Sequence, residues 1–418
     1  MTAPLAPRFA IEYASSLPTT AACAAAAGDV LTSYAADDPF ALVAELGSEE
    51  QLIASTVRDW VRRRFLPIIA DAWRAGGLPA ELAGELGELG LLGMHLEGYG
   101  CAGASASAYG LSCLELEAGD SGLRSFVSVQ GSLAMFAIHS FGSQEQKERW
   151  LPPMAAGEVI GCFGLTEPDA GSDPSAMRAS ARRDGDGWVL NGTKMWITNG
   201  SRAGVAVVWA KTDEGVRGFL VAAGSEGFRT VDVKDKLSLV ASTTSELIFE
   251  DCRLGADALL PGASSLRAPL ECLNEARYGI VWGAVGAARA CFEAALDYAA
   301  TRTQFGAPIA TRQLIQQELV EMHVAVNNGL LVATRLGQLK DKGQVTPEHI
   351  SYGKFHNVRM ATDVARRARA LLGANGITLE YPVMRHLVNL ESVLTYEGTH
   401  QIHTLVLGRA LTGHAAFE

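Results

Sequence analysis

The sequence lacks the patterns of secreted, zinc-binding and membrane-spanning proteins. Its seven cysteines, at positions 23, 101, 113, 162, 252, 272 and 291, include no Cys-x-x-Cys pair. This scatter predicts free thiols in a reducing cytoplasm, with neither a disulfide framework nor a zinc site. No apolar run reaches the roughly 18 residues that would indicate a membrane span. The first residues, "MTAPLAPRFAIEY", lack the basic and apolar blocks of a secretory signal. We therefore expect a cytoplasmic protein.

Basic charge and phosphate-binding motifs are also scarce. The 418 residues carry a formal net charge of -11, which argues against a nucleic-acid partner. No G-x-G-x-x-G follows a predicted strand, and no G-x-x-x-x-G-K-[ST] is present, which disfavours a doubly wound nicotinamide domain and P-loop chemistry. Hydrophobic residues make up 48% of the chain and charged residues 19%, so the sequence predicts a globular protein of about two or three domains.

Periodicity predicts an α+β protein with a β domain between two helical ones. An Ala-rich arm covers residues 1–38, and a helical domain follows over 39–160. Its first helix shows a capping-box pattern at Ser48 and Gln51. One apolar face of this helix comprises Ile53, Val57, Trp60, Val61 and Phe65.

Short β-prone runs predict an antiparallel barrel or sandwich over residues 161–262. Within it, Asn191-Gly192 is a strong hairpin signal. Long helical patterns over 263–418 predict a four-helix bundle. One of its helices begins with Thr346 capping Pro347 and stops at Gly373, and a last helix follows Thr399.

The stretch "LTYEGTHQIH", residues 394–403, offers three interpretations. Glu397 and His400 have the Glu-x-x-His spacing of di-iron bundles. Glu397 can also be an acid that favours a helix start capped by Thr399, or a catalytic base. No other histidine has an acidic residue three positions before it, so we expect no metal.

Two further stretches are candidates for ligand binding. In "CFGLTEPDAGSD", residues 162–173, Thr166, Gly171 and Ser172 can bond a polar ligand edge or a phosphate, although a plain turn-rich loop has the same composition. In "KMWITNG", Trp196 and Thr198 can lie beside a flat ring, although a tryptophan often simply fills a core.

Five motifs in order, "GLTEPDAGSD", "LNGTKMWITN", "RTQFG", "LLGANGI" and "YEGTHQIH", resemble the acyl-CoA dehydrogenase family over about residues 40–418. "EGYGCAGAS", "ELEAGDSGLRSFVSVQGSL", "LPGASSL" and "LNEARYGIVWG" are similar to its glutaryl-CoA dehydrogenase branch. The resemblance implies FAD, an acyl-CoA substrate, a homotetramer, and an electron-transferring flavoprotein as electron acceptor.

The resemblance also assigns cofactor and CoA residues. Those that would line FAD in the same subunit are Phe163, Leu165, Thr166, Gly171, Ser172, Trp196, Ile197 and Thr198, and Ser172 would reach the pyrophosphate or CoA. FAD of a neighbouring subunit would meet Arg302, Phe305, Gln313, Ala370, Gly373 and Ala374, and Thr399 and Gln401 would complete the site. Asn274 and Arg277 would contact the CoA part of the substrate.

By the same resemblance Glu397 is the base that removes the α-hydrogen of an acyl thioester. Burial would raise the pKa of its carboxyl group toward neutrality. Gly398 would let the backbone bend close to the thioester, and Tyr396 would pack the pocket.

Substrate choice depends on Arg124 and Ser125, which match residues that bind the distal carboxylate of glutaryl-CoA, and on Glu117, which would organise them. Without the resemblance, Arg124 would be interpreted as a surface arginine paired with Asp120. The expected reaction is oxidative decarboxylation of glutaryl-CoA to crotonyl-CoA and CO2. The alternative is a non-decarboxylating dehydrogenase of another carboxylated or short branched acyl-CoA. One departure from the family is Val240, where arginine is usual.

Overall fold

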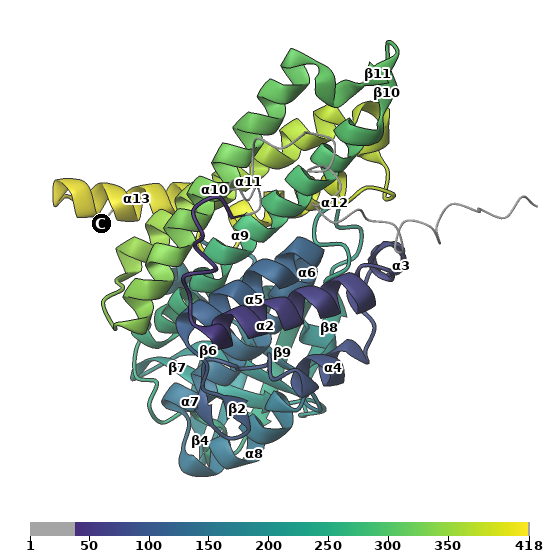
Figure 1. Ribbon diagram of the computed structural model, residues 1–418. Helices are drawn as coiled ribbons and strands as arrows, with labels where there is room; N and C mark the ends of the chain where they lie inside the picture. The colour runs from purple at the N-terminus through teal and green to yellow at the C-terminus, as the bar shows by residue number, and fades with distance from the viewer. Residues whose placement is uncertain (1–37, 417–418) are drawn as a thin grey trace, which may run out of the picture.

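The computed structural model describes residues 38–416, in three consecutive blocks (Figure 1). The predicted arm, residues 1–38, lies outside this range apart from its last residue. The first block is helical, as predicted, with a short hairpin of β1 (Glu97–Gly98) and β2 (Cys101–Ala102). Its helices are α2 (Ser48–Trp60), α3 (Ile69–Ala75), α4 (Leu82–Glu88), α5 (Ala106–Gly119), α6 (Ser121–Ser128), α7 (Phe136–Phe141) and α8 (Gln144–Ala155), with π-helical turns at Val61–Phe65 and Val129–Met135.

The apolar face predicted for the first helix is confirmed, whereas its capping box is wrong. Three of the five predicted face residues are buried and two are half-buried. Helix α2 starts at Ser48 itself, with Gly47 at the N-cap and no side-chain cap. The Gln51 amide instead donates to the carbonyls of Ala44 and Leu46, in the segment before the helix.

The second block is one seven-stranded sheet. Its strands are β3 (Gly161–Gly164), β4 (Ser180–Asp184), β5 (Gly187–Thr198), β6 (Val205–Thr212), β7 (Gly215–Ala222), β8 (Phe228–Asp232) and β9 (Thr244–Leu254). The order is β3-β6-β4-β5-β9-β8, with β7 also paired to β6. The expected antiparallel pairing holds for most of the sheet, but β3 runs parallel to β6, and one bridge between β4 and β6 is also parallel.

The hairpin predicted at Asn191-Gly192 is wrong, because both residues lie inside strand β5. The pair forms a β-bulge opposite β9, where the Asn191 Oδ1 accepts a hydrogen bond from the Asp251 amide at 2.8 Å. Gly192 has φ 136°, and a Cβ there would lie 2.6 Å from the Ala179 Cα. The chain reverses earlier, between β4 and β5, where Gly185 has φ 59°.

The third block is the predicted helical bundle. Its helices are α9 (Arg267–Thr301), α10 (Gln313–Asp341), α11 (Pro347–Leu371) and α12 (Pro382–Thr395), with a small hairpin of β10 (Thr303–Gln304) and β11 (Ala307–Pro308) before α10. The Thr346 cap, with Pro347 as first residue, is confirmed. Helix α13 (His400–Thr412) is capped by Thr399 as predicted and projects from the bundle (Figure 1).

Strand β6 shows how the sheet joins two cores. Side chains alternate between the faces of a strand, and here every second residue enters a different cluster. Val205, Val207 and Trp209 pack into the large core shared with the helices. Ala206, Val208 and Ala210 pack into a smaller core formed by the sheet itself. One face of the sheet is therefore attached to the helical blocks.

Helix α9 passes through the middle of the protein, between α5 and the other bundle helices (Figure 1). By length and composition it is the one described helix that could cross a membrane, but 67% of its apolar window is buried inside the protein, as in a core helix. Helices α5 and α9 approach closely at Gly283, where a Cβ would lie 1.9 Å from the Oε2 of Glu117. The glycine thus makes room for a buried carboxylate.

Gly283→Ala is expected to lower the free energy of unfolding by about 1–3 kcal/mol, because the added methyl group overpacks this contact. Chemical denaturation measures the loss. Gly84→Ala in α4 is the matched control, since a Cβ there meets nothing within 4 Å. The control should be neutral or more stable by about 0.5–1 kcal/mol. Equal losses in both variants would contradict the packing argument.

Candidate active site

Glu397 lies in a strained turn between helices α12 and α13. Its φ is 53°, and that of the following Gly398 is 95°, so two consecutive residues have left-handed backbone. Such conformations cost about 1–3 kcal/mol for a residue other than glycine and concentrate at functional sites. The turn ends at Thr399, whose hydroxyl accepts a hydrogen bond from the Ile402 amide and starts α13. The backbone therefore presents Glu397 apart from either helix.

Two cations, the half-buried Arg277 and the buried Lys354, hold the carbonyl groups of this turn. The Arg277 Nε, from α9, donates to the Glu397 carbonyl at 2.6 Å, and its Nη1 donates to the Asn274 Oδ1 at 3.1 Å. The Lys354 Nζ, from α11, donates to the Tyr396 carbonyl and, at 2.6 Å, to the Gly398 carbonyl. Asn274 and Arg277, predicted to contact CoA, thus lie directly at the Glu397 turn.

Sequence reasoning missed Lys354, although the sequence held a signal for it. The lysine lies four residues after Ile350 and seven before Ala361 on helix α11, and all three are buried. A lysine within the apolar stripe of a helix is rare unless its charge is paired.

The surroundings of Glu397 favour a proton acceptor. Burial raises the pKa of its carboxyl group, Arg124, Lys354 and Arg277 lower it in part, and Glu117 raises it further. Its Oε2 is buried and meets no hydrogen-bond partner among residues 38–416. A desolvated carboxylate with an open oxygen suits general-base chemistry.

Arg124 forms a buried polar group beside this turn. It is 0% exposed, its Nε donates to the Glu117 Oε2 at 2.7 Å, and its Nη2 donates to the Tyr396 hydroxyl. Ser125 also bonds the Tyr396 hydroxyl. The structure therefore brings together Arg124, Ser125 and Glu117, which were predicted to meet the distal carboxylate, with Tyr396, which was predicted to pack the pocket.

The interpretation of Arg124 as a surface arginine paired with Asp120 is wrong. Asp120 accepts from the Arg385 Nη1 at 2.5 Å and from the Asn389 Nδ2 at 3.0 Å. Its other oxygen accepts from the Gly122 amide, capping helix α6. This network fixes the start of the helix that carries Arg124.

Residues 162–173 comprise the end of strand β3 and the loop that follows it, and this loop is held against the end of strand β5. The Met195 amide donates to the Thr166 carbonyl at 2.8 Å. Beneath it, the Lys194 Nζ donates to the Glu167 Oε1 at 2.7 Å and to the Leu165 carbonyl at 3.1 Å. Phe163 and Leu165 are buried below the loop, whereas Gly171 and Ser172 are exposed. A buried ion pair thus fixes the loop against β5.

Trp196 lies next to this loop and is not a core residue. It is 58% exposed with φ 65°, while Ile197 is buried and Thr198 half-buried. A large apolar ring held open in a strained conformation, beside the half-buried Thr166, fits a flat ligand with a polar edge. These residues therefore fit an isoalloxazine ring.

The other predicted cofactor residues lie at the far end of the bundle. Phe305, at the tip of the β10–β11 hairpin, is 95% exposed with φ 53°, and Arg302 and Gln313 beside the hairpin are also exposed. Exposed Ala370, Gly373 and Ala374 lie near this end, where the Asn375 Nδ2 donates to the Tyr298 hydroxyl at 3.1 Å. Among residues 38–416, no hydrogen bond links the hairpin to the loop at 162–173.

Three remaining positions are placed as follows. His400 stacks on Phe355 with ring centroids 4.1 Å apart, and the described chain contains no group of three residues able to hold a metal. Gln401 is exposed near the start of α13. Val240 is half-buried between β8 and β9, and nothing in the structure explains why it replaces arginine.

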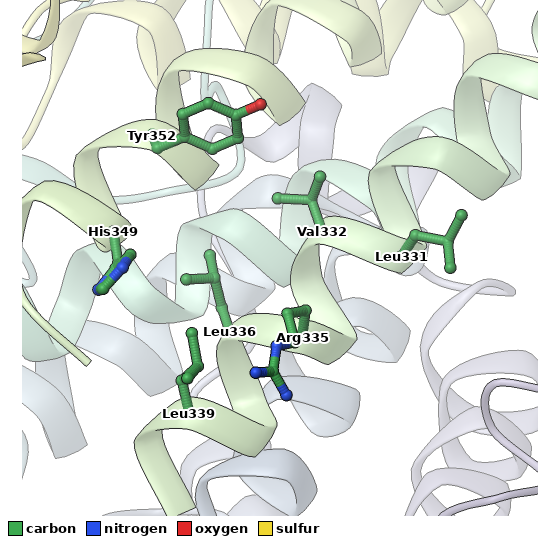
Figure 2. Close-up of a pocket in the computed structure, with 7 residues that line it drawn as sticks. All are labelled: Leu331, Val332, Arg335, Leu336, Leu339, His349 and Tyr352. Atoms are coloured by element: carbon green, nitrogen blue, oxygen red, sulfur yellow. The ribbon is translucent and has the colours of Figure 1, made fainter. Parts of the chain in front are cut away.

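A separate apolar groove lies on the outer surface of the bundle (Figure 2). It has a volume of about 330 Å³ and is lined by Leu331, Val332, Arg335, Leu336, Leu339, His349 and Tyr352, from α10 and α11. Figure 2 shows aliphatic side chains of α10 facing His349 and Tyr352 of α11. None of these residues belongs to the Glu397 cluster.

Family models match all three blocks. They are described as the acyl-CoA dehydrogenase N-terminal domain at residues 47–158, middle domain at 162–252 and C-terminal domain at 266–412. The human mitochondrial short-chain specific acyl-CoA dehydrogenase is 37% identical over 87% of this chain and 90% of its own length.

Two solved structures are also similar. A glutaryl-CoA dehydrogenase from Mycobacterium smegmatis is 63% identical, with a TM-score of 0.90 over 92% of this chain and 99% of the other. A glutaryl-CoA dehydrogenase from the same organism in complex with FADH2 is 58% identical, with a TM-score of 0.88 over 89% of this chain and 97% of the other.

Lys194→Met tests the role of the loop at 162–173. The change leaves the buried Glu167 carboxylate without its cation, which typically costs about 3–5 kcal/mol and should release the loop. We expect purified protein with less bound flavin, measured as visible absorbance per protein. Lys211→Met, at an exposed position on β6, is the control. Full flavin content in folded Lys194→Met protein would contradict this role.

Proposed function

The chain belongs to the acyl-CoA dehydrogenase family, whose members are FAD-dependent oxidoreductases acting on CH–CH bonds, and we propose that it converts glutaryl-CoA to crotonyl-CoA and CO2. The observation that carries this substrate assignment is the buried Arg124 beside Glu397 and Tyr396. The similarity to glutaryl-CoA dehydrogenases supports it.

Arg124 is the group that would select a second carboxylate. Burying a guanidinium costs several kcal/mol unless it is paired, and a pocket for a simple fatty chain has no use for it. Arginine offers five N–H donors, and the bonds to Glu117 and the Tyr396 hydroxyl use two of them. We assign the others to the distal carboxylate of the substrate, with Ser125 as a further donor.

Glu397 is assigned as the base that removes the α-proton. Its buried carboxylate would accept this proton while its backbone amide donates to the thioester oxygen, where negative charge develops. FAD supplies the acceptor for the β-hydride. The residues that would hold it are those of the loop at 162–173, Trp196 and Thr198.

Decarboxylation would use the same residue twice. The oxidised acyl chain carries its carboxylate on Cγ, and breaking that bond releases CO2 and leaves the electron pair delocalised into the thioester. Protonated Glu397 then returns its proton to Cγ, which gives crotonyl-CoA. A pocket that excludes water, closed by Tyr396, would prevent loss of that proton to solvent before it reaches the substrate.

We also propose a homotetramer in the cytoplasm that passes electrons to an electron-transferring flavoprotein. The hairpin of β10 and β11, which exposes Phe305, lies at the end of the molecule opposite the β block (Figure 1), so it can serve the cofactor of a second copy. The apolar groove between α10 and α11 fits coverage by another copy of the chain.

Glu397→Gln should retain the fold and bound FAD. Its flavin should be reduced by added acyl-CoA at least about a hundredfold more slowly, because the change removes a general base. Anaerobic stopped-flow absorbance measures the rate. Near-normal reduction in this variant would rule out Glu397 as the base.

Arg124→Ala should lower kcat/KM for glutaryl-CoA at least about tenfold more than for butyryl-CoA, because only the former needs a partner for its distal carboxylate. Using the ratio of two substrates on one preparation cancels any loss of folded protein. Arg58→Ala, which removes another arginine paired with a buried glutamate, should leave the ratio unchanged. Equal losses on both substrates would make Arg124 a structural residue.

A further inference from the structure

Lys354 is a buried cation that faces protein and not an open pocket. It is 2% exposed, and its Nζ donates to the carbonyls on either side of Glu397, those of Tyr396 and Gly398. A small cavity beside it holds about 10 Å³, room for at most about one water. That cavity is lined by Lys354, Phe355, Val358, Val393, Leu394, His400 and His403. The lysine therefore acts on the turn itself.

These bonds set the direction of the Glu397 amide. The peptide groups of the turn are trans and planar, so each N–H points opposite to the carbonyl of the same peptide. Because the Tyr396 carbonyl points to Lys354, the Glu397 N–H points away from it. The Glu397 carbonyl is held by Arg277 in turn, which fixes the next peptide. The left-handed backbone at Glu397 is thereby held on both sides.

We propose that Lys354 is a positioning residue for Glu397, which holds the turn that aims the base and its amide and supplies a positive charge that favours the ionised carboxylate. This inference rests on the proposed role of Glu397 as the base. The Lys354 Nζ donates its hydrogen bonds to backbone carbonyls of the turn and not to the Glu397 carboxylate. Its effect is transmitted through the turn and through charge.

The charges around Lys354 and Glu397 decide whether the lysine raises or lowers the pKa of the carboxyl group. Glu397 faces Arg124, Lys354 and Arg277 as cations and Glu117 as an anion. Burial lowers the pKa of Lys354 to about 7, Glu397 raises it in opposition, and Arg277 and Arg124 lower it further.

Two histidines also lie near Lys354, and the pKa of each is lowered. Burial lowers the pKa of His403 to about 3, with Lys354 and Arg277 adding to this shift. Burial, then Arg359 and Lys354, also lower the pKa of His400. Tyr396 stays protonated, since burial raises its pKa. Lys354, Arg124 and Arg277 are therefore the cations that oppose the rise in the pKa of Glu397 caused by burial.

The consequence is a pH shift in a defined direction. A cation lowers the pKa of a neighbouring carboxyl group, so removing the Lys354 charge must raise that of Glu397. Since only ionised Glu397 accepts a proton, flavin reduction rises with pH through this pKa. This rise on the acidic side of the rate–pH profile is called the acid limb. Loss of the Lys354 charge moves the acid limb to higher pH, by about one pH unit for a close opposite charge. The informative part of the profile lies below about pH 7, because Lys354, with a pKa of about 7, carries its charge there.

The test compares Lys354→Gln, which keeps hydrogen-bond donors but loses the charge, with Lys354→Arg, which keeps both. The rate of flavin reduction by glutaryl-CoA is measured anaerobically across pH on the FAD-loaded proteins. We expect the acid limb of Lys354→Gln to move up by about one unit and that of Lys354→Arg to stay with the wild type. Lys340→Gln, which removes a half-buried lysine of the bundle that is paired with Glu275, should also leave the limb in place.

An unmoved limb in folded Lys354→Gln protein would overturn the inference. An acid limb displaced in Lys354→Arg would also overturn the inference, because this variant keeps the positive charge. That outcome can be measured even if Lys354→Gln does not fold. These failures differ from failure of the proposed function: if glutaryl-CoA reduces the wild-type flavin, the dehydrogenation of glutaryl-CoA stands whatever the variants do. If no acyl-CoA reduces it, the proposed function itself fails.

Discussion

The burial of one carboxylate, that of Glu397, is the constraint on which the rest of the site depends. Desolvation makes the group basic, but a fully desolvated anion is too costly to keep ionised. Arg124, Arg277 and Lys354 supply positive charge around it, and two of these also hold its backbone. The site thus balances burial against cations, so that the carboxylate can both take a proton and return it.

The fold places these cations around Glu397 by bringing helices that are distant in the sequence to one turn. Helix α9 carries Arg277 and passes α5 closely enough that a glycine, Gly283, faces the carboxylate of Glu117. Helix α11 contributes Lys354 from the other side of the turn. The β block is attached through one face of its sheet, which leaves exposed Trp196 at a strand end available to the flavin. The cations Arg277 and Lys354 therefore sit on helices, and they hold the turn that carries Glu397, as precise positioning requires.

The sequence predicted the three-block architecture and the cluster around Glu397, because periodicity and ordered motifs carry that information. It failed where a local signal had two structural outcomes. Asn191-Gly192 suits both a hairpin and a bulge, and the pairing of β5 with β9 selected the bulge. Arg124 had an acidic neighbour in sequence, Asp120, but folding placed that acid against Arg385. Lys354 went unnoticed because its partners are backbone carbonyls, which no sequence pattern shows.

In the proposed reaction, a buried guanidinium selects glutaryl-CoA and the oxidised chain then loses CO2. The most direct measurement is to mix the flavin-loaded protein with glutaryl-CoA and an artificial electron acceptor, follow flavin bleaching, and identify the products by mass. We expect bleaching with formation of crotonyl-CoA and CO2. Accumulation of glutaconyl-CoA would contradict decarboxylation, and the absence of bleaching would contradict the choice of substrate.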